Sequence, residues 1–247
     1  MRRVLVTRPA GQAAELVGHL AALGIEAVSV PTVEIVPDRN GPLATALASL
    51  DETAWLVVTS ANGAAAIVAA LAGRRLPKRV RVAAVGPSTA AALEAGGMRV
   101  DVVPERYLTV AIADVLGDVA GRRTLLARAD AASPDLRDAL LARGALVDEV
   151  AAYRTLEGPA ASRDRLRAAV RDGVDAILFT SGSTVRGLVT LLPRHLRRRA
   201  TTIPALCIGP VTARTATVAG FRVAAIAAEH TAAGLAAATA AYFGDNA

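Results

Sequence analysis

The segment CIGPVTARTA (residues 207–216) runs from an apolar stretch through a Gly-Pro pair into an alanine- and threonine-rich helical pattern. The segment AVGPSTAAAL (residues 84–93) shows the same pattern 123 residues earlier. A threonine occupies the matching position in both segments, Thr89 and Thr212. Each segment is typical of a strand end, a tight turn and the first turn of a helix, so the chain is predicted to build this corner twice.

Two further pairs of segments repeat at nearly the same spacing. VTSANGAAAIVAAL (58–71) matches FTSGSTVRGLVTLL (179–192) at an offset of 121 residues. RVLVTRPAGQAAELVGHLAALG (3–24) matches RTLLARADAASPDLRDALLARG (123–144) at an offset of 120 residues. Three matches at nearly one spacing indicate a twofold internal duplication.

Short apolar runs alternate with alanine-rich helical segments along both copies. The predicted strands are continuous apolar runs, which indicates burial on both faces and therefore parallel α/β layers. They cover residues 3–7, 54–60, 81–86, 123–128, 175–181 and 204–209, and the helices that follow them cover 12–24, 64–71, 88–97, 134–144, 184–192 and 211–220. Gly24, Gly97, Gly144 and Gly220 are each predicted to stop a helix before the next strand.

The duplication can be divided into domains in two ways. Either each half of the chain is a domain, or the domains exchange a segment and one of them is discontinuous. The segments TVEIVPDRNGP (32–42) and YRTLEGPAAS (153–162) could be crossing points, since each begins extended and ends in a Gly-Pro break. The repeats by themselves leave both divisions open.

Composition and charge narrow the class of protein. The chain has 247 residues, a net charge of +6 and only 3% aromatic residues. A basic balance favours an acidic ligand. The densest basic run, PRHLRRRA (193–200), has no interleaved aromatic residues and is predicted to be a solvated helix end, so nucleic acid is not the expected partner.

The single cysteine, Cys207, lies within an apolar strand, which excludes a disulfide framework and argues against a zinc site or a nucleophilic thiol. This cysteine usage fits a cytoplasmic protein. The apolar run near the N-terminus is too short for a signal sequence, and the apolar stretch near residue 230 is interrupted by Glu229 and His230, so no membrane partner is expected.

Polar residues and glycines concentrate where the predicted strands end and the helices begin. In open parallel sheets, ligands bind at this edge, and helix N-termini favour carboxylates and phosphates. The candidate binding residues are Thr7, Arg8, Ser60, Ala61, Asn62, Gly86, Ser88, Thr89, Arg128, Ser181, Gly182, Ser183, Gly209, Val211 and Thr212. The alternative interpretation of each serine or threonine is a helix N-cap.

Several enzyme signatures are missing from the sequence. No GxGxxG follows the first strand, no P-loop is present, and neither TSANG nor TSGST is a nucleophile elbow. His19 is predicted in mid-helix, His195 in a basic loop and His230 in a late loop, all as surface or capping residues. Tyr153 lies at a proposed crossing point, either as a packed strand residue or as a phenol that can donate a proton in a cleft.

The repeated segments, together with LLARADAASPDLRDALLARGALVDEVAAYRT (125–155), resemble the uroporphyrinogen-III synthase family from the N-terminus to about residue 240. The IGP-x-TA corner (208–213) and the L-x-x-RGA stretch that leads to Tyr153-Arg154 are the most specific parts. This resemblance implies two similar flavodoxin- or Rossmann-like domains joined by a two-stranded linker. It places residues 1–33 and 158–247 in a discontinuous domain, 38–152 in an inserted domain, and linkers at about 34–37 and 153–157.

The resemblance also implies an activity. The family closes the linear tetrapyrrole hydroxymethylbilane to uroporphyrinogen III, inverting the last ring and releasing water, in the biosynthesis of haem and cobalamin and without a cofactor or metal. Tyr153 matches the usual candidate acid, and Thr212 and Ser60 match residues that line the cleft, with Thr89 and Ser181 as their counterparts in the repeat. A monomer that makes a transient contact with hydroxymethylbilane synthase is expected.

Two other classes of function compete with this reading. One is a synthase-like module that binds a tetrapyrrole or another polyanion without catalysis. The other is a nucleotide-dependent enzyme of the doubly wound type, which the missing glycine fingerprint disfavours.

Overall fold

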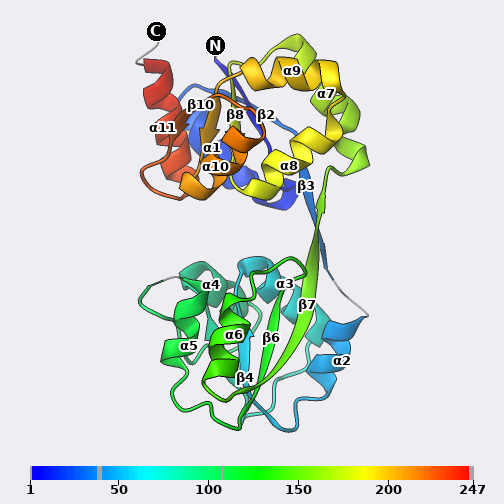
Figure 1. Ribbon diagram of the computed structural model, residues 1–247, viewed down its shortest axis with the longest axis vertical. Helices are drawn as coiled ribbons and strands as arrows, with labels where there is room; N and C mark the ends of the chain where they lie inside the picture. The colour runs from blue at the N-terminus through cyan, green and yellow to red at the C-terminus, as the bar shows by residue number, and fades with distance from the viewer. Residues whose placement is uncertain (1, 38–40, 107, 245–247) are drawn as a thin grey trace. The chain divides into compact units, whose positions relative to one another are not determined.

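The computed structural model describes residues 2–37, 41–106 and 108–244 of the chain. The chain divides into two compact units, which are coloured by sequence in Figure 1. Unit 1 comprises Met1–Glu34 and Leu156–Ala247, and unit 2 comprises Ile35–Thr155. Unit 2 is therefore inserted into unit 1 along the sequence. The chain passes between the units within β3 (Val33–Pro37) and β7 (Leu146–Glu157).

Unit 1 contains a five-stranded sheet in the order β10-β9-β8-β1-β2, and its described strand pairs are parallel. Numbered along the chain, these strands follow the order 2-1-3-4-5 of flavodoxin-like folds. The strands are β1 (Arg3–Val6), β2 (Glu26–Ser29), β8 (Ala176–Phe179), β9 (Ala205–Cys207) and β10 (Val223–Ile226).

Helices cover both faces of this sheet. Val4 and Val6 pack with α1 (Ala14–Ala22) and α11 (Ala232–Gly244) on one face. Leu5 and Ile177 pack on the other face with α7 (Arg163–Asp172), α8 (Gly182–Leu191), α9 (Arg194–Thr202) and α10 (Pro210–Val218). Figure 1 shows α1 and α11 next to each other, although they come from opposite ends of the chain. Short 3₁₀ turns at Ala10–Gln12 and Ala160–Ser162 precede α1 and α7.

Unit 2 has a second sheet in the order β3-β7-β6-β4-β5, with β4 (Thr53–Val58), β5 (Arg81–Ala84) and β6 (Arg123–Ala129) as its remaining strands. The core on one face contains α2 (Pro42–Ala48), α3 (Ala61–Leu71) and α4 (Pro87–Ala95). The core on the other face contains α5 (Ile112–Val115) and α6 (Asp135–Ala142), with a 3₁₀ turn at Thr109–Ala111 before α5.

The internal repeat is visible in the two sheets. In the sequence repeat, β1, β8 and β9 of unit 1 correspond to β6, β4 and β5 of unit 2. The three strands are neighbours in that order in each sheet. The chain enters the second copy at a different strand, because β4 and β5 precede β6. The predicted α/β class with two parallel sheets is confirmed.

The predicted helix ends are also confirmed. Gly24, Gly97, Gly144 and Gly220 have φ values of 71°, 78°, 79° and 88°. These left-handed values are accessible to glycine without the steric cost that a Cβ atom brings, and they allow the chain to leave the helix and re-enter the sheet.

One local prediction is wrong. His195 was expected in a loop and the run 193–200 at a helix end, but these residues form most of α9. Pro193 precedes the first turn, and Leu196 and Ala200, four residues apart, bury one face of the helix. The helix was hard to predict because only two apolar residues mark its buried face, and the many arginines around them are compatible with both a loop and a solvated helix face.

Candidate functional site

The predicted binding residues of unit 1 lie at the carboxyl edge of its sheet. Thr7 and Arg8 follow β1, and Ser181–Ser183 follow its neighbour β8. The strand order reverses between β1 and β8, because β2 lies on one side of β1 and β8, β9 and β10 lie on the other. Such switch points are where doubly wound sheets bind ligands.

Unit 2 repeats this arrangement between β6 and β4. Arg128 lies near the end of β6, and Ser60–Asn62 follow β4. Gly86, Ser88 and Thr89 lie at the start of α4 after β5. The structure thus brings the predicted residues together as two separate sets, one at the carboxyl edge of each sheet.

Tyr153 and Ser60 form the most specific contact among these residues. The phenolic oxygen of Tyr153 lies 3.0 Å from Ser60 Oγ, and either oxygen can be the donor. The backbone N–H of Gly63 donates to Ser60 Oγ at 3.0 Å, so Ser60 is also the N-cap of α3. Only 7% of Tyr153 is exposed.

A β-bulge explains how Tyr153 reaches this position. In the pairing of β6 with β7, Arg128 lies opposite Ala151 but Ala129 lies opposite Tyr153, so Ala152 is the extra residue. Successive residues of a regular strand point to opposite faces. Ala152 and Tyr153 nevertheless both belong to the core beneath α3, because the bulge turns Tyr153 onto that face.

Several predicted binding side chains are engaged inside the protein. Arg128 is 2% exposed, and its guanidinium donates to Glu149 Oε1 at 2.7 Å and to the Ser133 carbonyl at 2.6 Å. Thr7 is fully buried, and its hydroxyl donates to the Leu178 carbonyl at 2.7 Å. These two residues hold the edge of each sheet in shape.

The helix starts at the two edges differ in how they are capped. Ser181 Oγ accepts from the Thr184 N–H at 3.2 Å and contacts Ser183 Oγ at 2.8 Å, so the N-cap interpretation holds for Ser181 as it does for Ser60. In the described structure α4 and α10 have glycine N-caps, Gly86 and Gly209, without a side-chain cap. A proline, which carries no N–H, occupies the first position of each helix, so the N–H groups of Ser88 and Val211 are the natural anion-binding groups of these corners.

The remaining corner residues divide by exposure. Ser88 and Val211 are exposed in the first turns of α4 and α10, whereas Thr89 and Thr212 are buried at 1% and 5% exposure. Ala61 is exposed, and Asn62 and Gly182 are half-buried. Arg8 is half-buried as well, and within the described residues its Nη1 atom is buried without a hydrogen-bond partner.

His230, which the sequence predicts to be a surface or capping residue, lies beside one of these corners. Its imidazole lies so close to Gly209 that a Cβ on this glycine would lie 3.2 Å from Nε2. His230 follows β10 and is exposed. The sequence around Gly209 does not indicate this neighbour, because the pairing of β9 with β10 brings Gly209 and His230 together.

The titratable groups at the edges offer little nucleophilic or metal chemistry. Burial raises the pKa of the Cys207 thiol to about 11, so the thiol is neutral at physiological pH. Within residues 2–37, 41–106 and 108–244, no group of three histidine, cysteine or acidic side chains is placed to hold a metal ion. The same residues contain no helix that is both long and apolar enough to cross a membrane.

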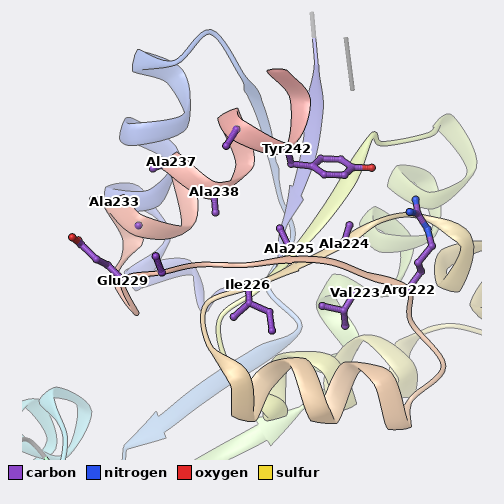
Figure 2. A pocket seen from close by; sticks show the side chains of 13 residues that line it. Arg222, Val223, Ala224, Ala225, Ile226, Glu229, Ala233, Ala237, Ala238 and Tyr242 are labelled. Carbon is purple, nitrogen blue, oxygen red and sulfur yellow. The ribbon is translucent and has the colours of Figure 1, made fainter. Parts of the chain in front are cut away.

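A cavity of about 980 Å³ lies away from these corners, along β10 and α11 of unit 1. Figure 2 shows Ala224 and Ala225 on the side of β10 that faces α11, with Arg222 and Glu229 toward the two ends of the groove. Its lining includes none of the predicted binding residues. Alanine side chains make up much of its lining.

The chain is similar in sequence to known proteins. The family model described as uroporphyrinogen-III synthase HemD matches residues 14–237. A uroporphyrinogen-III synthase of Synechococcus elongatus is 31% identical over 246 residues, covering 95% of this chain and 92% of its own length. A uroporphyrinogen-III synthase of Salmonella typhimurium is 33% identical over 201 residues, covering 78% of this chain and 81% of its own length.

Solved structures show the same fold at lower identity. A uroporphyrinogen III synthase mutant from Thermus thermophilus has a TM-score of 0.65 at 20% identity and covers 99% of this chain and all of its own. The Helicobacter pylori uroporphyrinogen-III synthetase has a TM-score of 0.62 at 16% identity, covering 95% of this chain and 96% of its own. Both likenesses concern the α/β architecture.

Proposed function

Because the chain belongs to the uroporphyrinogen-III synthase family, we propose that it cyclises hydroxymethylbilane to uroporphyrinogen III, inverting the last pyrrole ring and releasing water. The observation that carries this proposal is the family match over residues 14–237, which includes every strand of the two sheets except β1. The protein is thus a cofactor-independent lyase of tetrapyrrole biosynthesis.

The reaction asks little of the protein as a chemical reagent. The hydroxyl of the hydroxymethyl group must leave as water, which needs a proton donor nearby, while the pyrrole nitrogen supplies the electron pair that expels it and the methylene carbon stays on the ring. The resulting azafulvene cation is attacked at a substituted carbon of the last ring, giving a spiro intermediate. The main task is to hold the chain in the conformation that favours this attack over direct closure.

We assign the proton donor to Tyr153. The bulge in β7 turns its phenol, which carries an exchangeable acidic proton, toward Ser60 at the start of α3. Cys207 is unsuited to this role, because it is fully buried in β9 and its pKa is raised to about 11.

The eight carboxylates of the substrate are assigned to the corners of both sheets. The backbone N–H groups of Ser88 and Val211, which follow the prolines that open α4 and α10, bind carboxylates at these corners. The unpaired Nη1 atom of Arg8 supports an anion at the β1 end of unit 1. Arg128 and Thr7, whose polar atoms are engaged internally, act by supporting the loops around them.

The protein is proposed to work as a cytoplasmic monomer that receives its substrate through transient contact with hydroxymethylbilane synthase. The lone buried cysteine fits a reducing compartment. The net charge of +6 favours capture of a polyanionic substrate at low ionic strength.

A coupled assay tests the proposed function. Porphobilinogen and its deaminase generate hydroxymethylbilane with or without this protein, and the oxidised porphyrin isomers are separated by chromatography. We expect the product to shift from type I, the result of direct closure, to type III. Persistent type I product from a folded sample would contradict the assignment and favour a non-catalytic tetrapyrrole-binding relative.

A further inference from the structure

The contact between Ser60 and Tyr153 links two elements that are 93 residues apart in sequence. Ser60 is fixed at the end of β4 by its role as N-cap of α3, where its φ of −164° and ψ of 155° are extended. Tyr153 is fixed by the bulge in β7 and is 93% buried. Both side chains are therefore held in place with their oxygen atoms 3.0 Å apart.

The protons available to this pair restrict what each hydroxyl can do. A serine hydroxyl has one proton and two acceptor sites, and the Gly63 N–H occupies one of these acceptor sites. If Tyr153 donates to Ser60, the phenolic proton is consumed within the pair and Tyr153 can only accept from a ligand. If Ser60 donates to Tyr153, the phenolic proton is left for the ligand.

We propose that Ser60 is a positioning residue that donates its proton to the phenolic oxygen of Tyr153 and so directs the Tyr153 O–H toward the substrate. This inference rests on the proposed function, in which Tyr153 is the acid. The hydrogen bonds then run in one direction, from Gly63 N–H to Ser60, from Ser60 to Tyr153, and from Tyr153 to the ligand. Bonds aligned in this way strengthen one another.

The same arrangement stabilises the charge that proton transfer creates. As the hydroxymethyl C–O bond breaks, the leaving oxygen keeps the electron pair of that bond, takes the phenolic proton and departs as water. The electron pair of the broken O–H bond stays on Tyr153, where the Ser60 O–H and the positive N-terminal end of α3 face it. The proton lost when the last pyrrole regains aromaticity restores the phenol.

This role differs from direct contact between Ser60 and substrate. A serine that binds substrate contributes independently of Tyr153, whereas a serine that acts through Tyr153 contributes nothing once the phenol is gone. A double-mutant cycle separates the two, because the effects of independent residues multiply and those of coupled residues do not.

The experiment compares the wild-type chain with Ser60→Ala, Tyr153→Phe and the double variant in the coupled assay. We expect Ser60→Ala to lower kcat about tenfold with little change in KM, as loss of one hydrogen bond to a developing charge predicts. We expect the double variant to have the kcat of Tyr153→Phe. Equal fold-losses from Ser60→Ala in both backgrounds, or a Tyr153→Phe variant with wild-type kcat, would overturn the proposal.

Two further sets of variants separate this effect from loss of the helix cap. Ser60→Thr keeps the hydroxyl and should restore most of kcat, and Ser60→Gly removes it at a cap cost of only a few tenths of a kcal/mol but should be as slow as Ser60→Ala. Ser181→Ala is the matched control, because Ser181 caps α8 in the same way while its hydroxyl contacts Ser183.

The fold-change from Ser181→Ala should be the same with Tyr153 and with Phe at that position. A Ser60→Gly variant with wild-type kcat would contradict the proposal. Failure of the proposed function itself would appear differently, as type I product from the wild-type protein.

Discussion

At the scale of single residues, burial and partners decide which polar side chains remain available for a ligand. Arg128 and Arg8 both lie at the carboxyl ends of strands, yet Arg128 donates to Glu149 and to the Ser133 carbonyl, while Nη1 of Arg8 is left unpaired among the described residues. A buried guanidinium that loses its hydrogen-bond partners destabilises the fold, so Arg128 has a structural role. The same residue type at equivalent positions therefore has two roles.

Cys207 illustrates how burial alone sets the chemistry of a side chain. The thiol is fully buried in β9, and desolvation raises its pKa from 9.0 to about 11. Because the thiolate is the reactive form, we expect a thiol-reactive dye at pH 8 to label the folded protein at least about a hundredfold more slowly than the urea-unfolded chain. Comparable labelling rates in the two states would show that the strand opens readily.

The raised pKa of Cys207 also predicts a pH dependence of stability. Below about pH 9 the thiol is protonated in both the folded and the unfolded chain, and its full contribution to stability is present. As the pH rises from about 9 to about 11, the unfolded chain ionises first and the free energy of unfolding falls. Cys207→Ala should lack this component, so parallel pH–stability curves for the two proteins would contradict the assignment.

At the scale of elements, α8 contacts both segments of unit 1 that connect to unit 2 along the chain. The Thr32 hydroxyl donates to the Thr184 carbonyl at 2.8 Å, and the Gly158 N–H donates to the Thr32 carbonyl at 2.9 Å. Arg186 donates to both carboxylate oxygens of Glu157 at 2.6–3.1 Å. One helix thus holds both segments that continue into β3 and out of β7.

This close packing is possible because residue 187 is a glycine, which has no Cβ atom. A Cβ atom at this position would lie 1.9 Å from the Thr32 carbonyl oxygen and 3.1 Å from the Gly158 nitrogen, both backbone atoms. We expect Gly187→Ala to destabilise the protein by about 3 kcal/mol, because the helix or the segment must shift. The measurement is the midpoint of urea unfolding.

Gly18→Ala is the matched control for this prediction. Gly18 lies in α1, and a Cβ there would meet no atom within 4 Å. Replacing a helical glycine in open space by alanine should raise stability by about 0.5–1 kcal/mol. A loss of stability in Gly18→Ala equal to that in Gly187→Ala would show that the cost at Gly187 does not come from contact with Thr32.

At the scale of the whole molecule, the two units have separate cores. Leu56 of β4 is fully buried in the core of unit 2, and Leu188 of α8 is fully buried in the core of unit 1. The chain passes between the units only within β3 and β7. The units are therefore expected to unfold as separate cooperative bodies.

Calorimetry with one truncation in each core tests this expectation. Leu56→Ala and Leu188→Ala should each cost about 2–5 kcal/mol, since both leave a cavity. Each should lower the Tm of one transition by roughly 10 °C and leave the other unchanged. A single transition that moves equally in both variants would show that the units unfold together.

Features that depend on local pattern could be predicted from the amino-acid sequence alone. Continuous apolar runs predicted buried parallel strands, and glycines at 24, 97, 144 and 220 predicted the helix ends, because periodicity and backbone freedom act over a few residues. The repeat at offsets of 120–123 residues predicted two copies of one unit. It also placed Cys207 inside a strand, where it is fully buried.

Which of the polar residues at the strand ends share a site depends instead on how distant segments pack. The Ser60–Tyr153 hydrogen bond joins residues 93 apart and requires both the strand order β7-β6-β4 and an extra residue in β7, which no local pattern marks. The internal partners of Arg128 and Thr7 likewise come from other strands and loops. Hydrogen bonding between distant segments depends on strand order and register, and these are set by packing of the whole sheet.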